Sequence, residues 1–305
     1  MRVAVLIPCY NEAAAIAAVV RDFRAALPGA RVYVYDNNST DRTRELAAEA
    51  GATVRLETRQ GKGHVVCRMF ADVDADVYVL VDGDDTYDAA SAPKMVERLI
   101  AEQLDLVTGV RVSHSAGAYR PGHVLGNRLL TGLVGSLFEN RFSDMLSGYR
   151  VFSRRFVKSF PALVAGFEIE TAFTIHALEL RMPCAELATP YKDRPAGSAS
   201  KLRTYHDGFR ILLTILRLLL EVRPLALLGS CAILSAATSL ALAIPLFITY
   251  AQTGLVPRQP TAVLSASLML LAFLSLATGL ILDSVTLGRR EAKRLAYLDI
   301  PAPQA

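Results

Sequence analysis

The sequence predicts an α/β domain with a mostly parallel sheet, followed by an amphipathic helix and a hairpin of two transmembrane helices. Between Arg2 and Gly109, short apolar runs alternate with segments of helical length, a pattern typical of a parallel sheet covered by helices. Near the carboxyl end only Arg258 and Asp283 are charged among residues 224–288, which indicates segments that lie in lipid. Clusters of short polar side chains directly follow the apolar runs, at the strand ends where such sheets bind ligands.

Composition narrows the class of protein. The 305 residues are 52% hydrophobic, too apolar for a wholly soluble or disordered chain. Outside the apolar region the charges have an ordinary globular density, which excludes a polytopic transporter. The net charge of +4 comes from interspersed acids and bases, so a membrane surface is favoured and no nucleic-acid partner is expected. The four cysteines lack the spacing of a disulfide framework or a zinc site, which fits a reducing compartment.

Each element of the predicted domain follows from its own pattern. Short apolar runs predict five strands, at Val3–Ile7, Arg31–Tyr35, Thr53–Leu56, Val77–Val81 and Asp105–Thr108. Alanine-rich or amphipathic segments predict helices at Glu12–Leu27, Asp41–Ala50, Gly63–Ala71 and Ala92–Glu102. The region from Gly117 to Lys201 is expected to complete the sheet, with helices near His123–Phe138 and Glu168–Arg181 and a short segment at Tyr149–Phe152.

The carboxyl-terminal third predicts attachment to a membrane. Between Thr204 and Val222 the charged side chains fall on one narrow stripe of an otherwise apolar helix. This favours a helix that lies in the membrane interface, and a buried amphipathic helix is the alternative. Two apolar stretches, about 225–250 and 261–282, each exceed the ~20 residues that cross a bilayer.

Basic residues set the expected orientation. They flank the two apolar stretches on their outer sides, and only Arg258 lies in the connecting loop, so the positive-inside rule places both termini in the cytosol. The first apolar run is too short for a secretory signal. We therefore expect a multi-pass protein of the cytoplasmic membrane with four parts: a cytosolic domain 1–203, an interfacial helix 204–223, a transmembrane region 224–288 and a cytosolic tail 289–305.

Polar residues follow the first three predicted strands. They are Tyr10 and Glu12 after the first, where Pro8 also lies, Asp36 and Asn38 after the second, and Lys62 after the third. The cluster that begins at Asp36 suits hydrogen bonding to a base and ribose, although a turn with a helix cap explains part of it. Glycines on both sides of Lys62 allow a phosphate to approach its positive charge, and a flexible turn is the alternative.

Carboxylates follow the fourth predicted strand. Asp82, Asp84 and Asp85 come directly after Val81, with Gly83 between the first two. Mutual repulsion among these acids calls for a cation, and Mg²⁺ commonly uses one or two carboxylates together with substrate phosphates. A solvated acidic turn is the alternative. The metal is favoured because all four polar clusters follow successive strands and meet at one edge of the sheet.

These motifs together resemble the GT-A-fold glycosyltransferases of family 2, in particular the polyprenyl-phosphate hexose synthases related to dolichyl-phosphate mannose and glucose synthases. The resemblance covers nearly the whole chain and lies in Pro8–Glu12, Asp36, the DxD motif Asp82–Asp84, Arg111, Arg128, Asp144–Arg155 and Ser200–Leu202. Thr86 replaces a Gln that relatives often carry, and Asn37 and Asn38 replace an acid and a Gly. The chain has no Trp, so it lacks the QxxRW motif of processive synthases and polymer synthesis is not expected.

The resemblance implies inverting transfer of one hexose from a nucleotide diphosphate sugar to polyprenyl phosphate such as undecaprenyl phosphate. The implied nucleotide-sugar contacts are Pro8, Tyr10, Glu12, Asp36, Asn38, Lys62, Asp82 and Gly83. Asp82 and Asp84 are the implied ligands of Mg²⁺ or Mn²⁺, and Asp84, Arg111 and Arg128 the catalytic residues. Arg111, Arg128 and Lys201 are expected to hold the acceptor phosphate, which needs steering more than a general base because its second pKa is about 6.

Several alternatives stay open at this point. Asp144, Glu168 and Glu170 are candidates for sugar hydroxyls, although the dipole of a helix amino terminus explains the two glutamates equally well. A UDP sugar such as UDP-glucose or UDP-N-acetylglucosamine is favoured because Asp82–Tyr87 departs from the usual mannosyl pattern, with GDP-mannose as the alternative. A membrane-tethered nucleotide-sugar binding protein without transfer activity is the alternative from another class. A homo-oligomer is also left open.

Overall fold

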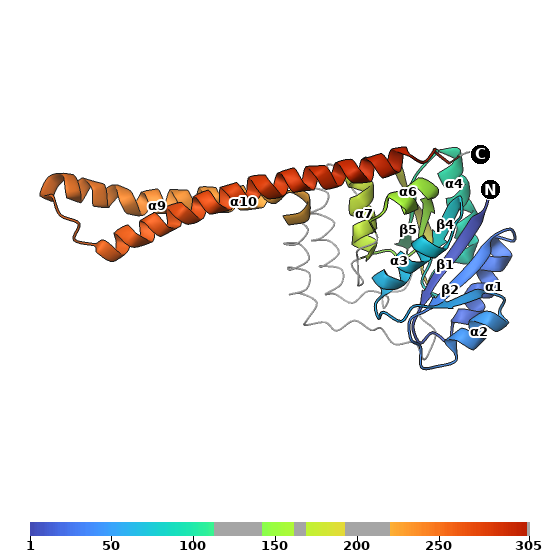
Figure 1. Cartoon of the computed structure of the whole chain (residues 1–305). Coiled ribbons are helices and arrows are strands. Elements are labelled where there is room, and N and C mark those ends of the chain that lie inside the picture. The colour runs from blue at the N-terminus through green and yellow to red at the C-terminus, as the bar shows by residue number, and fades with distance from the viewer. Residues whose placement is uncertain (113–141, 162–168, 193–219, 304–305) are drawn as a thin grey trace. The chain divides into compact units, whose positions relative to one another are not determined.

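The structure is a computed structural model that describes residues 1–112, 142–161, 169–192 and 220–303 (Figure 1). The chain forms two compact units. The first comprises Met1–Thr204 together with Ala292–Ala305, and the second comprises Tyr205–Glu291. The end of the chain therefore belongs to the first unit, whereas the sequence pattern treats 289–305 as a separate tail.

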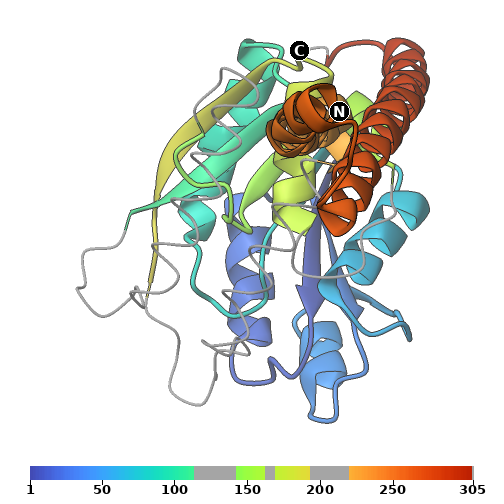
Figure 2. The same ribbon diagram turned by 90° about the vertical axis from the view of Figure 1, so that its left-hand side faces the viewer.

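A seven-stranded sheet forms the centre of the first unit, in the order β3-β2-β1-β4-β6-β5-β7. Its strands are β1 (Val3–Cys9), β2 (Arg31–Asp36), β3 (Thr53–Leu56), β4 (Val77–Leu80), β5 (Leu106–Val112), β6 (Arg150–Ser153) and β7 (Cys184–Pro190). Only β6 runs antiparallel to its neighbours β4 and β5. In Figure 2 the strands fan out across the view, with β7 (yellow) at one edge. The mostly parallel α/β domain predicted from the sequence is confirmed.

Helices cover both faces of this sheet. One face carries α1 (Ile16–Ala26), α2 (Thr43–Glu49) and α4 (Ala92–Ala101), and the other carries α3 (Lys62–Asp72), α6 (Arg154–Ser159) and α7 (Ile169–Glu179) (Figure 1). A short 3₁₀ helix, η1 (Ala89–Ser91), precedes α4. The two layers follow from alternation along the strands, which sends successive apolar side chains to opposite faces.

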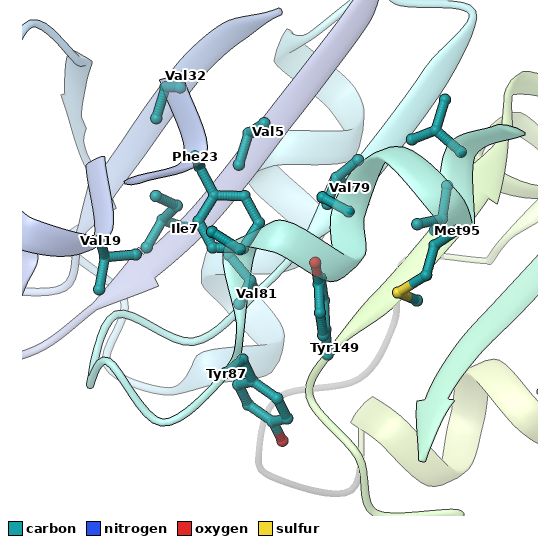
Figure 3. Close-up of a cluster of buried hydrophobic side chains, with 14 of the residues drawn as sticks. Val5, Ile7, Val19, Phe23, Val32, Val79, Val81, Tyr87, Met95 and Tyr149 are labelled. Carbon is teal, nitrogen blue, oxygen red and sulfur yellow. The ribbon is translucent and has the colours of Figure 1, made fainter. Parts of the chain in front are cut away.

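The core between the sheet and α1 fixes the ends of β1 and β4. Ile7 of β1 and Val79 of β4 are fully buried and belong to one cluster with Phe23 of α1 (Figure 3). Phe23 meets Tyr149 edge to face, with ring centroids 5.9 Å apart. Tyr149 immediately precedes β6, so this contact anchors the chain just before the antiparallel strand.

Aromatic rings form the core on the opposite face. Phe70 of α3 lies 5.8 Å from Phe173 of α7, and Phe152 of β6 lies 4.9 Å from Phe173. Phe156 and Phe160 extend the same cluster. Large aromatic side chains contribute much of the apolar burial in a core. This cluster therefore fixes α7 against α3, which matters because both helices bear charged residues of the candidate site.

Some elements differ from the sequence expectations. The predicted helix at Glu12–Leu27 begins only at Ile16, because Asn11 adopts a positive φ of 53° and residues 12–15 form a turn. Neither α6 nor β7 was predicted: α6 is short, and β7 is an edge strand with the mixed sequence CAELATP. The expected helix at His123–Phe138 lies outside the described residues.

The last turns of the chain pack within the first unit. Tyr297 donates a hydrogen bond from Oη to the buried Asp105 at 2.8 Å, and Asp105 also accepts from Arg155 at 2.8 Å. Lys293 pairs with Glu179 of α7 at 2.6 Å. The end of the chain is thus part of the α/β domain rather than an independent tail.

Two long helices make up most of the second unit. They are α9 (Pro224–Thr253) and α10 (Gln259–Leu298), and α10 continues into the first unit. Their most apolar stretches have mean hydropathy of 2.2 and 2.1, with only 11% and 17% of residues buried inside the protein. Ser239 donates a hydrogen bond to the carbonyl of Ser265 at 2.7 Å and joins the two helices. Length and exposed apolar surface indicate a membrane association. The predicted interfacial helix 204–223 lies almost wholly outside the described residues.

Candidate active site

The loops after β1 and β2 are joined by hydrogen bonds from backbone to side chain. The Asn11 N–H donates to Ser39 Oγ at 2.8 Å, and the Thr40 N–H donates to Asn11 Oδ1 at 2.8 Å. The Glu12 N–H donates to Thr43 Oγ1 at 2.9 Å. Pairing of β1 with β2 brings these loops to the same edge of the sheet. They form a fixed wall that includes the predicted nucleotide contacts Tyr10 and Glu12, and the third predicted contact, Pro8, lies near the end of β1.

Asp36 lies at the end of β2 and is fully buried. Its Oδ2 accepts a hydrogen bond from the Ser39 N–H at 3.0 Å, and Arg44 Nε lies 3.8 Å from the same oxygen. Its Oδ1 is buried and has no hydrogen-bond partner among the described residues. A buried acceptor left unsatisfied costs about 1–3 kcal/mol. The atom is therefore suited to accept one hydrogen bond from a ligand.

Two asparagines fasten the loop after β2 to the loop after β3. Asn37 Nδ2 donates to the carbonyl oxygens of Glu57 and Arg59, each at 2.8 Å, and Asn37 Oδ1 accepts from the Gly61 N–H at 2.8 Å. Asn38 donates to the same loop at 2.8 Å. Asn38 was predicted as a nucleotide contact, and its amide group here ties two loops. Asn37 was not singled out, although a short amide directly after a strand is a signal for such a tie.

Lys62 stands at the amino terminus of α3 and contacts two acids from distant parts of the chain. Its Nζ lies 2.6 Å from Asp82 Oδ1 and also forms an ion pair with Glu170 Oε1 of α7. The Lys62 and Glu170 side chains are 10% and 7% exposed. Burial alone would lower the pKa of Lys62, but the two carboxylates raise this pKa above its ordinary value. The structure therefore brings together three predicted site residues around one buried ammonium group.

The remaining acids after β4 have other partners. Asp84 is 4% exposed, and its Oδ1 accepts from Thr86 Oγ1 at 2.6 Å. Asp85 pairs with Lys192 at 3.5 Å. The Thr86 hydroxyl thus orients Asp84 from the position where relatives often carry Gln.

Two glycines let the backbone pack closely around this acidic loop. A Cβ on Gly83 would lie 2.6 Å from Cys9 Sγ, and a Cβ on Gly148 would collide with the Asp82 carboxylate. The Gly148 N–H donates to Tyr87 Oη at 2.8 Å. Gly148 was not among the predicted site residues. Its place in the Asp144–Arg155 motif was the available signal, but only the fold brings it beside Asp82.

Arg111 and Asp144 form a bidentate ion pair. Arg111 Nε lies 2.7 Å from Asp144 Oδ2, and Arg111 Nη2 lies 2.8 Å from Asp144 Oδ1. Both side chains are largely buried, at 18% and 8% exposure. Burial alone would raise the pKa of Asp144, but its hydrogen bonds from Arg111 hold this pKa below the ordinary value. Asp144 thus uses both carboxylate oxygens to orient Arg111.

The residues after β4 fit a divalent cation only in part. Asp82 and Asp84 offer two carboxylates, and no group of three or more His, Cys, Asp or Glu gathers as a metal site within the described ranges. Mg²⁺ in protein sites is commonly held by one or two carboxylates plus substrate phosphates and water, so this donor set suits a cation that a diphosphate completes. The predicted residues Arg128, Glu168 and Lys201 lie outside the described part of the chain.

Comparison with known proteins agrees with this architecture. Residues 4–160 match the family described as Glycosyl transferase family 2. Glycosyltransferase AglJ of Haloferax volcanii is 35% identical over 301 residues, which cover 97% of this chain and 98% of that protein. The dolichyl-phosphate hexose transferase of the same organism is 30% identical over 224 residues, which cover 72% and 95%.

A solved structure is similar in fold. Glucosyl-3-phosphoglycerate synthase of Mycobacterium tuberculosis aligns with a TM-score of 0.57 over 70% of this chain and 80% of that chain, at 24% sequence identity. Another structure of that protein, in complex with Mn²⁺, uridine diphosphate and glucosyl-3-phosphoglycerate, aligns with a TM-score of 0.54. The GT-A fold class is thereby confirmed. The chain belongs to glycosyltransferase family 2, and it is a glycosyltransferase.

Proposed function

We propose that the protein transfers one hexose, with inversion, from a nucleotide diphosphate sugar to the phosphate of a polyprenyl lipid. The observation that carries the proposal is the acidic loop after β4, where Lys62 joins Asp82 to Glu170, in a chain that also bears two apolar helices. The relative named dolichyl-phosphate hexose transferase supports the same substrate class.

The donor nucleotide lies against the loops after β1, β2 and β3 in this proposal. Pro8, Tyr10, Glu12 and Asn38 line the base and ribose region. Asp36 offers a single unpartnered oxygen, Oδ1, because its Oδ2 already accepts from Ser39. Uracil presents one N–H donor, at N3, whereas guanine presents N1–H and an amino group side by side. A single unpartnered oxygen therefore favours uridine over guanine.

The diphosphate lies over the loop after β4. Asp82 and Asp84 hold Mg²⁺ or Mn²⁺ there, and Gly83 keeps the backbone close to the donor. The metal, when bound, stabilises the charge that develops on the leaving diphosphate. Lys62 supplies a further positive charge on the same side, and Glu170, which is paired with Lys62, is the candidate for a sugar hydroxyl.

The acceptor phosphate is steered by cationic side chains. A phosphate monoester is already mostly ionised at neutral pH because its second pKa is about 6, so orientation and charge screening matter more than proton removal. Arg111 is one ligand, held in place by Asp144, and Arg128 and Lys201 are the others. A guanidinium has five N–H donors, so the pair with Asp144 is compatible with a phosphate on the same side chain.

The apolar helices serve the reaction by holding the enzyme at the bilayer, where a polyprenyl phosphate exposes its headgroup. Basic residues lie on the outer sides of both apolar stretches, which supports a two-pass arrangement with the catalytic domain and both termini in the cytosol. GDP-mannose as donor is the second candidate, and its extra N–H donors make it the weaker one at Asp36.

A donor panel tests this function. The full-length protein is incubated in detergent with undecaprenyl phosphate, Mg²⁺ or Mn²⁺ and a series of UDP and GDP sugars, and the glycolipid is identified by mass and by the configuration at its anomeric carbon. We expect one UDP-hexose to give a singly glycosylated lipid. Product only with GDP-mannose overturns the uridine assignment, and no glycolipid with any donor overturns the acceptor class.

A further inference from the structure

The ion pairs of Lys62 include the same carboxylate that the proposed function assigns to a metal. Asp82 Oδ1 lies 2.6 Å from Lys62 Nζ, and the Lys62 side chain is only 10% exposed. Glu170 bonds the same ammonium group from the other side. The Asp82 side chain is 29% exposed, so it is more accessible to solvent than Lys62. A buried amine thus already neutralises part of the acidic loop.

Two cations cannot share Asp82 without a large penalty. Mg²⁺ binds carboxylate oxygens at ~2.0–2.1 Å, which would place it within a few ångströms of the ammonium group. The divalent charge doubles the repulsion that two unit charges would have at this distance, and partial burial of the site strengthens it further. Simultaneous binding of both cations to Asp82 is therefore unfavourable, and release of Asp82 by Lys62 would relieve the repulsion.

We propose that Lys62 is a resident cation that occupies Asp82 while the donor site is empty and moves from Asp82 to the donor phosphate when metal and nucleotide sugar bind together. Glu170 is the positioning residue that holds Lys62 throughout this exchange. The inference rests on the proposed function, because it assumes that a nucleotide diphosphate sugar and a divalent cation use this loop. It adds that the protein alone takes up the cation weakly and that the donor makes uptake favourable.

The surroundings of the three residues support an exchange over a short distance. Glu170 is fixed by α7, which the Phe70–Phe173 contact holds against α3. Lys62 has a flexible four-carbon stem, so its Nζ can pivot while it stays bonded to Glu170. Gly148 confines the Asp82 carboxylate from the other side, so the lysine is the part that moves.

The test measures Mn²⁺ binding to the full-length protein without donor, by electron paramagnetic resonance of the free ion. We expect Lys62→Met to bind Mn²⁺ at least about tenfold more tightly than the wild type, because removal of one competing charge is worth 1.4 kcal/mol or more. The KM for the donor sugar should rise in the same variant, since its phosphate loses a ligand. Lys62→Gln is the second variant: its amide can still hydrogen bond both acids, so it preserves folding if the methionine does not.

Lys192→Met is the matched control. It removes the same charge from the same acidic loop, but Lys192 pairs with Asp85 at 3.5 Å and is 49% exposed. A general electrostatic effect would tighten Mn²⁺ binding in both variants, whereas the proposed exchange predicts a change of less than about twofold for Lys192→Met.

Equal tightening in both variants, or no tightening in either Lys62 variant, overturns the proposal. Neither result depends on catalysis. A wild type that makes glycolipid but shows no effect of Lys62 on Mn²⁺ binding refutes the exchange and leaves the proposed function intact. Tightening in Lys62→Met without glycolipid from any donor supports the resident cation and refutes the proposed acceptor.

Discussion

The two sides of the candidate active site are held together by different forces. On the nucleotide side, the loops after β1, β2 and β3 are joined by short hydrogen bonds through Asn11, Asn37 and Asn38. On the transfer side, ion pairs join Lys62 of α3 to Asp82 and Glu170, and Arg111 of β5 to Asp144.

This difference indicates which side is rigid and which side exchanges partners. Uncharged hydrogen bonds between loops give a fixed wall, which suits recognition of a base. Charged side chains that pair with each other in the absence of a ligand can pair with a charged ligand instead. In doing so they lose the ion pair within the protein. We therefore expect substitutions on the transfer side to affect chemistry most, and substitutions on the nucleotide side to affect binding and stability.

The largest effect is expected for Asp84→Asn on the transfer side. Loss of a carboxylate that is proposed to hold the metal should lower kcat by roughly 10²–10³-fold, measured as glycolipid formed under saturating donor. Asp85→Asn is the control, because Asp85 lies one residue away and pairs with the exposed Lys192 at 3.5 Å. Similar losses in both variants would show that net charge matters rather than Asp84 itself.

A smaller effect is expected when the buried pair of Arg111 is broken. Asp144→Asn leaves a buried guanidinium without its bidentate carboxylate, which should lower the free energy of unfolding by about 3 kcal/mol and raise the KM for lipid phosphate more than the KM for donor. Asp72→Asn is the matched control: Asp72 pairs with the exposed Arg55 and Arg68, so a loss below about 1 kcal/mol is expected. Equal losses in thermal or denaturant unfolding would contradict the proposed difference.

On the nucleotide side, Asn37→Ala tests whether uncharged hydrogen bonds hold the loop after β2 in place against the loop after β3. The variant loses three bonds of 2.8 Å and should lose about 2 kcal/mol of stability, with a higher KM for donor and nearly unchanged kcat. Asn38→Ala should lose less, because its bonds are exposed. A fall in kcat with unchanged donor KM would count against the fixed wall.

The smallest expected effect is a pH dependence of stability that arises from His176, a buried residue in the core beneath the transfer side. Burial lowers the pKa of His176 on α7 to about 3, whereas an unfolded His has a pKa of about 6.5. The unfolded state therefore binds more protons between these values, and stability falls as pH drops through 6.5. From pH 7 to pH 6 the wild type should lose about 0.7 kcal/mol through this residue, and His176→Gln should lack that part of the slope in denaturant titrations.

Local patterns were sufficient for most elements of the fold. Apolar runs predicted β1, β2, β4 and β5, because mostly buried strands carry their signal in consecutive residues, and alternation in Thr53–Leu56 predicted the exposed edge strand β3. The edge strand β7 and the short helix α6 were missed, since β7 mixes polar and apolar residues on a strand with one neighbour. The end of the chain was assigned to a separate tail because nothing local reveals that Tyr297 reaches Asp105.

For the candidate site as well, residues with a local sequence signal were predicted and residues defined by distant contacts were not. The acids after β4 and Asp36 were predicted from their position directly after strands, and the two apolar helices from length and hydropathy. Gly148 and Asn37 were not found, because their importance lies in contacts with Asp82 and with the loop after β3.

The sequence by itself thus determined the kind of fold, the apolar helices and the residue types at the strand ends, because these depend on neighbours along the chain. Only the tertiary structure decided the partners. Lys62 and Glu170 are 108 positions apart in the sequence, and their ion pair exists because aromatic packing fixes α7 against α3. Whether a charged side chain is available to a ligand or is already paired within the protein depends on such contacts between distant segments. A local sequence pattern contains no information about these contacts.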